Sequence, residues 1–275
     1  MQIEGIKLRR LTPPKDSLRD ALRAAKLRLR EGDIVAISSK VVSIDEGACV
    51  PIDSIEKRKL IEQEADWYYR TPHSRYRSVF TIAKGYMPGA AGIDESNGNG
   101  YYILYPKDPF KSAKRWRTWL RKEYRVDKLG VVITDSTSLP LRRGAIGFAL
   151  SWDGLDPLRD YRGTKDIFGR TIQAEVANLV DALATAAVLE MGEGGEQTPV
   201  AVIRNARNIV LKNVPHTKEP LIVSPEDDSS PPCSGGAGGR KEEAGRASAP
   251  SFRLTQRSHL YIQGHSRRAR PRACV

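Results

Sequence analysis

Cysteine and histidine are scarce in this chain of 275 residues, which has three cysteines and four histidines. The cysteines, Cys49, Cys233 and Cys274, show none of the close spacings that ligate metals, and their odd number leaves one thiol unpaired. Cys49 has no histidine close to it in the sequence, so we interpret it as a structural thiol rather than a nucleophile. Only His73 and His216 lie in the first four fifths of the chain, which argues against a histidine-based metal triad. Sparse cysteine fits a reducing compartment, and we expect a cytoplasmic protein.

Long apolar runs are also missing. The most apolar segment, Leu179 to Met191, is interrupted by Asp181 and Glu190, whereas a membrane helix needs about 20 apolar residues. The N-terminus shows no basic segment followed by an apolar core, so we expect no secretory signal. The sequence therefore predicts no membrane span and no export.

Positive charge is in excess, because 45 Lys and Arg residues against 33 Asp and Glu residues give a net charge of +12. Residues 229–275 hold nine basic and two acidic residues and contribute +7 of this total. The same segment is rich in Ser, Pro and Gly without hydrophobic periodicity, which is typical of disorder. We therefore divide the chain into one domain, residues 1–228, and a disordered basic tail, residues 229–275. We disfavour nucleic acid as a partner, since a basic tail is more often simply solvated, and keep RNA binding by the tail as an alternative.

Hydrophobic periodicity predicts helices and strands in mixed order. Apolar residues three and four positions apart indicate helices, and short apolar runs indicate strands. The expected helices span residues 17–29, 53–69, 111–124 and 174–191, and the expected strands span 33–37 (resuming at 41–42), 78–83, 101–104, 130–134 and 199–203. Because helices and strands do not alternate regularly, we expect an α+β fold rather than a doubly wound sheet.

Two tryptophans in the helix expected at 111–124 allow two interpretations. Trp116, Trp119 and Leu120 are three and four residues apart, which is typical of a stripe that faces a core. The Lys and Arg residues around them would also fit a basic aromatic patch. We favour the core-facing stripe.

Carboxylates follow a predicted strand and occupy glycine-rich turns. Asp135 and Ser136 come directly after the strand at 130–134, while Asp94 and Glu193 lie in glycine-rich segments. Carboxylate and neutral oxygens are the ligands that Mg²⁺ and Mn²⁺ prefer. These residues therefore form a candidate metal site, against the simpler interpretation that an Asp after a strand caps a turn.

Several Lys and Arg residues accompany these clusters, namely Lys40, Arg142, Arg143, Arg159, Arg162 and Arg170. A core does not tolerate so many cations unless anions pair with them, which points to phosphate. The glycines after Met191 fit either a helix C-cap or a loop whose amides approach phosphate oxygens. The sequence has neither a P-loop nor a Rossmann fingerprint, so any nucleotide site is of another kind.

Five clusters, taken in order, resemble a known family. They are Ser39-Lys40-Val41-Val42-Ser43 with Glu46-Gly47, Ala91 to Asn97 (AGIDESN), Val131 to Ser136 (VVITDS) with Arg142-Arg143-Gly144, Gly154 to Gly163 (GLDPLRDYRG), and Asp166 to Arg170 (DIFGR). Their order and spacing resemble the coenzyme F420-0:L-glutamate ligase family over roughly residues 3 to 225.

The resemblance implies a mixed-sheet, coenzyme F420 ligase-like fold that forms an intertwined homodimer. It also implies an enzyme that joins the amine of L-glutamate to a carboxylate of a deazaflavin phosphate acceptor, as a γ-glutamyl amide. In such an enzyme GTP activates the carboxylate as an acyl phosphate, with Mg²⁺ or Mn²⁺ bound beside the nucleotide and K⁺ as a further candidate ion.

The resemblance extends to individual positions. Asp94, Asp135, Ser136 and Glu193 match metal ligands, and we expect Asp94, Asp135 and Arg143 to act in catalysis. The matched nucleotide contacts are Ser39, Lys40, Asn97, Met191, Gly192, Gly194, Gly195 and Thr198.

The chain departs from the family pattern in three places. Ile44 stands where the family usually has a nucleotide-contacting Lys, and residues 135–141 (DSTSLPL) replace the usual Asp-Thr-Phe-Gly-Arg-Pro-Trp. Residues 6–14 lack the usual Pro-Gly-Asp-Asp spelling. These departures keep two alternatives open, a homologue that binds nucleotide without catalysis and a ligase that acts on a different acceptor.

Overall fold

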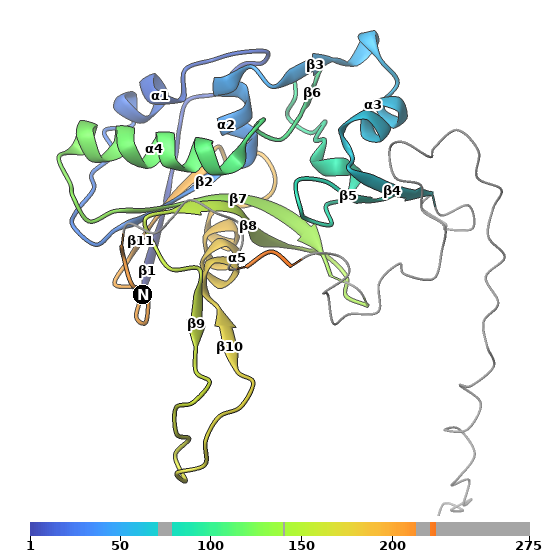
Figure 1. The fold of residues 1–275 in the computed structure, drawn as a ribbon. Helices are drawn as coiled ribbons and strands as arrows, with labels where there is room; N and C mark the ends of the chain where they lie inside the picture. Colours follow the sequence, from blue (N-terminus) through green and yellow to red (C-terminus); the bar gives the residue numbers. More distant parts are fainter. Residues whose placement is uncertain (71–78, 140, 213–220, 224–275) are drawn as a thin grey trace, which may run out of the picture.

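The computed structural model describes residues 1–70, 79–139, 141–212 and 221–223 (Figure 1). The expected boundary at residue 228, the tail at 229–275, and both His73 and His216 lie outside the described residues.

Helices and strands follow one another in mixed order along the chain. The helices are α1 (Leu18–Ala24), α2 (Ser39–Glu46), α3 (Lys57–Glu64), α4 (Pro109–Tyr124) and α5 (Leu179–Met191), with short 3-10 turns η1 (Ile52–Ser54) and η2 (Ala90–Gly92). The strands are β1 (Gln2–Ile6), β2 (Ile34–Ser38), β3 (Cys49–Pro51), β4 (Trp67–Arg70), β5 (Val79–Ile82), β6 (Tyr101–Ile103), β7 (Gly130–Ser138), β8 (Ala145–Asp153), β9 (Leu158–Asp160), β10 (Val176–Asn178) and β11 (Val200–Arg204).

A mixed sheet forms the centre of the molecule. Within the described ranges it has five strands, in the order β1-β11-β2-β7-β8. The strands β2 and β7 are parallel, with Ile34 opposite Gly130 and Ser38 opposite Thr134. The other neighbouring strands of this sheet are antiparallel. The expected α+β fold with a mixed sheet is therefore confirmed.

Helices cover both faces of this sheet because its strands are apolar on both sides. Val35 and Ile37 of β2 pack with α1, α2 and α4 on one face. Ile34 and Ala36 point the other way and pack with α5. The full burial of β2 explains why its sequence is a continuous apolar run rather than an alternating one.

Ends of several strands lie together at one edge of the central sheet. The parallel strand β2 ends there, where Ser38 pairs with Thr134 of β7, and β7 continues past this point to Ser138 beside β8. The antiparallel strand β11 begins at the same edge, because Val200 pairs with Ile37, and β1 ends there opposite Val200. Segments that follow β1 and β2, or precede β11, therefore meet at this edge beside β7.

Some expected element bounds are wrong. The strand expected to resume at residues 41–42 is instead helix α2, because the chain turns at Ser38 and packs Val41 and Val42 against the sheet face as helix residues. The helix expected at 53–69 is shorter than predicted, because only α3 (Lys57–Glu64) is helical and the chain from Trp67 forms strand β4. The helix expected from residue 174 begins at Leu179, where Asn178 caps it by accepting a hydrogen bond from the Asp181 amide.

The ribbon β9-β10 extends from the domain as a long arm (Figure 1). At its far end the side chains of Ile167 and Phe168 are 92% and 89% exposed. Among the described residues, no helix combines the length and the apolar character needed to cross a membrane.

The tryptophans of α4 confirm the core-facing stripe. Trp116 is 1% exposed and Leu120 is fully buried, both in the cluster under α1 and α2. Trp119 is partly buried and packs edge-on against Trp116, with ring centroids 5.5 Å apart. Arg19 and Arg23 of helix α1 lie over the Trp119 ring, with their Cζ atoms 5.7 and 5.6 Å from its centroid.

We expect Trp116→Ala to lower the free energy of unfolding by about 3–5 kcal/mol, because it removes a large, fully packed side chain. Chemical denaturation followed by circular dichroism measures this change. Lys114→Ala on the exposed side of the same helix is the matched control and should change stability by about 0.5 kcal/mol or less. A loss below about 1 kcal/mol for Trp116→Ala would contradict the core assignment.

Candidate functional site

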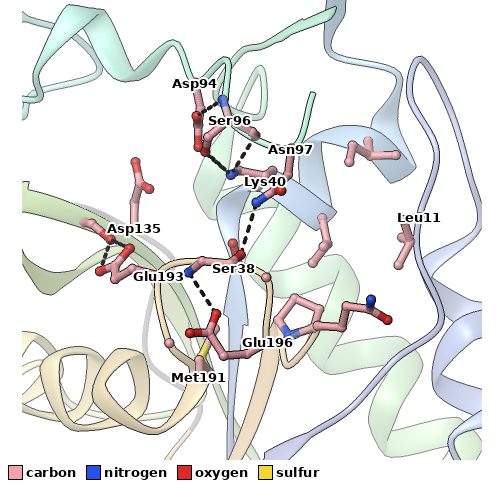
Figure 2. Close-up of a pocket in the computed structure, with 18 of the residues that line it drawn as sticks. Leu11, Ser38, Lys40, Asp94, Ser96, Asn97, Asp135, Met191, Glu193 and Glu196 are labelled. Atoms are coloured by element: carbon pink, nitrogen blue, oxygen red, sulfur yellow. Dashed lines mark hydrogen bonds and ion pairs between the residues drawn. The ribbon is translucent and has the colours of Figure 1, made fainter. Parts of the chain in front are cut away.

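A cavity of about 1130 Å³ lies at the edge where the strand ends gather (Figure 2). Its walls include the segments after β1 and β2, residues 134–136 within β7, the segment before β11, and residues 92–99 next to η2. Figure 2 shows Asp135 and Glu193 at one end, Leu11 at the opposite end, and Lys40 and Asn97 between them. A volume of this size can hold a nucleotide-sized ligand.

Lys40 stands at the centre of the cavity, in the first turn of α2. Its Nζ is 2.6 Å from Asp94 Oδ2 and donates hydrogen bonds to the carbonyl and the hydroxyl of Ser96, each at 3.0 Å. The Ser96 amide in turn donates to Asp94 Oδ1 at 2.7 Å. Burial works to raise the pKa of Asp94, but Lys40 and Ser96 outweigh it and hold that pKa below its ordinary value.

Asp135 lies at the end of the cavity away from Leu11 and has a different environment. Burial raises its pKa to about 6, and the negative charge of Asp94 acts in the same direction, although Lys40 opposes it. No ion pair to Asp135 is found in the described part of the chain. A carboxylate that is desolvated and unpaired is a favourable position for a cation.

The ring of Tyr105 lies beside Asp135, and burial together with this carboxylate raises the pKa of the Tyr105 hydroxyl. Gly92 makes room for the ring. It has a φ of +74°, and a Cβ at this position would lie 2.1 Å from Cε2 of Tyr105. Only glycine fits both the backbone conformation and the close approach.

The segment 191–198 forms another wall of the cavity. Gly192 is the C-cap of α5, with a positive φ of 78° that favours glycine, so the helix C-cap interpretation is confirmed. The following glycines are exposed and line the cavity. Asn97 Nδ2 donates to the Gly194 carbonyl at 3.1 Å, and the Gly194 amide donates to Glu196 at 2.8 Å. Thr198 Oγ1 donates to the Met191 carbonyl at 2.5 Å and so closes the loop.

The expected metal ligands were tested against the geometry. Among the described residues, no three His, Cys, Asp or Glu side chains converge closely enough to hold one ion. Asp94 is paired with Lys40, and Glu193 accepts hydrogen bonds from Ser136 Oγ at 2.7 and 2.8 Å. The donor set nevertheless fits Mg²⁺ or Mn²⁺, because Mg²⁺ is usually bound by one or two carboxylates together with substrate phosphates and water.

Most of the residues expected to contact ligands line this cavity. They are Lys40, Asp94, Asn97, Asp135, Ser136, Met191, Gly192, Glu193, Gly194, Gly195 and Thr198. Ser39 is buried and does not line the cavity, whereas its neighbour Ser38 does. Arg143 is exposed in the connection between β7 and β8 and lies outside the cavity walls. Arg142, Arg159 and Arg170 likewise do not line it.

Several wall residues were missed by the sequence analysis. The role of Ser96 could have been inferred, because Asp-x-Ser commonly forms a turn in which the Asp accepts from the amide two residues on. Arg10 lies on the wall within the segment 6–14, which the sequence analysis noted only as a departure from the family pattern. No sequence signal marked Tyr105, which does not line the cavity but lies beside Asp135. Cys49 is half-buried in β3, and burial raises the pKa of its thiol to about 11, which supports the structural interpretation.

The raised pKa of Asp135 makes the metal-free protein less stable as pH rises. Between its ordinary pKa near 4 and its folded value of about 6, the folded state binds more protons than the unfolded state, so stability falls across this window. With a chelator present, we compare the free energy of unfolding of Asp135→Asn with that of the natural protein. From pH 4.5 to pH 7.5 this difference should shift by about 1–2 kcal/mol in favour of the variant. Denaturation at both pH values measures this.

Asp127→Asn, whose side chain is 94% exposed, is the control and should show no such gain. A stability difference for Asp135→Asn that stays constant with pH would show that the carboxylate is not desolvated.

Comparison with known proteins agrees with this geometry. The family model described as F420-0:Gamma-glutamyl ligase matches residues 6–205. The coenzyme F420:L-glutamate ligase of Methanopyrus kandleri is 34% identical over 245 residues, which cover 83% of this chain and 96% of the relative. The enzyme of the same name from Methanocaldococcus jannaschii is 30% identical over 197 residues, covering 66% of this chain and 79% of the relative. The chain belongs to the F420-0:gamma-glutamyl ligase family.

Proposed function

We propose that this protein is a GTP- and divalent-metal-dependent ligase that joins L-glutamate to a carboxylate of a coenzyme F420-0-like acceptor. The observation that carries the proposal is the convergence of Lys40, Asp135 and the glycine-rich segment 191–198 on one cavity. Three relatives of this chain carry the name coenzyme F420:L-glutamate ligase, which supports the same substrates.

The triphosphate of the nucleotide would lie between Lys40 and the glycine-rich segment. Glycines without Cβ atoms let backbone amides approach phosphate oxygens closely. The Lys40 ammonium provides a positive charge within reach, and it would exchange part of its pairing with Asp94 for phosphate. Asn97 holds the Gly194 carbonyl and thereby orients this segment.

Asp135 would hold Mg²⁺ or Mn²⁺ with Asp94, Ser136 and Glu193 as the remaining protein ligands, and K⁺ is a further candidate ion. Such an ion offsets the charge that builds up when a phosphoryl group is transferred. On the protein side, ionised Asp135 is required, so cation binding should strengthen as pH rises through about 6.

The chemistry follows from the low reactivity of carboxylates toward amines. The acceptor carboxylate attacks the γ-phosphorus of GTP, which releases GDP and forms an acyl phosphate. The glutamate amine then attacks the acyl carbon, loses a proton, and expels inorganic phosphate as the amide forms. The cavity would position both steps, because orientation of bound reactants accounts for much of the barrier reduction in such transfers. The catalytic assignments of Asp94, Asp135 and Arg143 stay predictions.

We expect the full chain to bind GTP only when Mg²⁺ or Mn²⁺ is present, and Asp135→Ala to reduce this affinity at least tenfold, as titration calorimetry will measure. The reason is that Asp135 is a desolvated carboxylate on the cavity wall and makes no ion pair among the described residues. Asp127→Ala is the control and should bind normally. Metal-independent binding, or normal binding by Asp135→Ala, would contradict the proposed roles. Tight GTP binding without amide formation across candidate acceptors would favour the non-catalytic alternative.

We further propose a homodimer in which the arm β9-β10 of one subunit contacts its partner. The arm ends in Ile167 and Phe168, whose side chains are 92% and 89% exposed. Large apolar side chains at this exposure on a projecting arm are typical of an interaction surface. Arg143 and Arg170 lie outside the cavity of their own subunit, so a role for them in the site would require a second copy of the chain.

We expect the double variant Ile167→Ser and Phe168→Ser to shift the protein from dimer to monomer, as light scattering after size-exclusion chromatography will measure. Both residues are exposed, so the change should leave the fold of the subunit intact. Met87→Ser, also an exposed apolar side chain but in the segment between β5 and η2, should leave the dimer unchanged. A natural protein that is monomeric at micromolar concentration would contradict the proposal.

A further inference from the structure

Four cationic side chains line the cavity, and their pairing separates one from the rest. Three of them form ion pairs: Arg9 Nη2 is 2.7 Å from Asp16 Oδ1, Lys40 Nζ is 2.6 Å from Asp94 Oδ2, and Lys57 Nζ is 3.0 Å from Glu95 Oε2. The remaining cation, Arg10, is exposed, and within the described ranges its side chain makes no ion pair and no hydrogen bond. Its guanidinium is therefore available to a ligand.

Arg10 is placed at a particular end of the cavity. It follows β1, and the chain is anchored there by the Leu8 amide, which donates to the Gln197 carbonyl at 2.9 Å. Its neighbour Leu11 lies at the end opposite Asp135 (Figure 2).

The walls near Leu11 are apolar. Leu11, Val41 and Ile44 belong to one buried cluster and also line the cavity. Apolar walls suit the flat faces of a nucleobase, whereas the opposite end, with Lys40 and the glycine-rich segment, suits phosphates.

We propose that Arg10 determines the base specificity of the nucleotide site, by donating hydrogen bonds to O6 and N7 of guanine. This inference rests on the proposed function, in which a nucleoside triphosphate occupies the cavity. Guanine presents two acceptors at this edge, O6 and N7, which match the paired donors of a guanidinium. Adenine presents N7 but replaces O6 with an amino donor, which repels a second donor.

The acidic side chains of the cavity are used elsewhere. Asp94 and Glu95 are each paired with a lysine, and Glu196 accepts from the Gly194 amide. Glu193 holds Ser136, and Asp135 lies at the far end from Leu11. Within the described residues, no unpaired carboxylate is left at the Leu11 end to receive the N2 amino group of guanine. The proposed Arg10 contact, which uses O6 and N7 alone, should therefore not distinguish guanine from hypoxanthine, which lacks only that group.

The experiment compares GTP, ITP, ATP and inorganic tripolyphosphate by titration calorimetry with the full chain and Mg²⁺. We expect GTP and ITP to bind within about threefold of each other, and both to bind about ten- to hundredfold tighter than ATP, which is the discrimination usual for one bidentate arginine contact. In Arg10→Ala the preference for GTP and ITP over ATP should disappear, while ATP and tripolyphosphate keep their affinities within about twofold.

Two further variants serve as controls. Arg10→Lys keeps a single donor group and should retain part of the preference. Lys7→Ala removes an exposed cation that does not line the cavity, and it should change nothing. Because Arg10 and Lys7 are both exposed, neither alanine variant is expected to disturb folding, and a denaturation curve checks this.

The outcomes separate this inference from the proposed function. If Arg10→Ala weakens tripolyphosphate binding as much as it weakens GTP binding, Arg10 contacts phosphate, and the inference is overturned. Equal affinities for GTP and ATP in the natural protein, or ITP binding far weaker than GTP, would also overturn it while leaving the ligase proposal intact. Absence of any nucleotide binding by folded protein would remove the proposed function and this inference together.

Discussion

The parallel pairing of β2 with β7 is the constraint on which the rest of the site depends. Parallel neighbours end at the same edge of a sheet, so the residues that follow Ser38 and Thr134 emerge side by side. Strand β11 is antiparallel to β2 and begins at this edge, and β1 ends there. One set of backbone ladders thus brings Lys40, Asp135, the glycine-rich segment and Arg10 to a single cavity. The sheet is buried on both faces, which makes this edge a rigid support.

Charge pairing within the cavity gives each carboxylate a separate character. Asp94 has a lysine beside it and a pKa below its ordinary value, whereas Asp135 has no ion pair in the described part and a pKa of about 6. The two groups lie in one cavity, so the difference comes from desolvation and from the position of Lys40 rather than from residue type. A bound nucleotide and cation would redistribute these pairings, since phosphate competes for Lys40 and a cation favours ionised Asp135.

The sequence predicted the elements whose patterns are local. The α4 stripe and the buried strands β2 and β7 follow from residue spacing. Predictions failed where tertiary contacts override local preference. Val41 and Val42 are β-branched and favour a strand, yet burial against the sheet face keeps them in helix α2. The start of α5 was placed too early, because pairing with β9 holds residues 176–178 in a strand.

For the candidate site, the sequence by itself identified the residues whose chemistry suits a nucleotide and a cation: the carboxylates Asp94 and Asp135, the cation Lys40, and the glycines after Met191. It could do so because turns, caps and ligand chemistry are encoded within a few neighbouring residues. Only the tertiary structure decided which of them share a cavity, that Ser39 is buried and off its wall, that Arg143 lies outside it, and that Arg10, beside Leu11, has no ion pair among the described residues. These properties depend on strand order and on distances between segments far apart in the chain, which no local pattern contains.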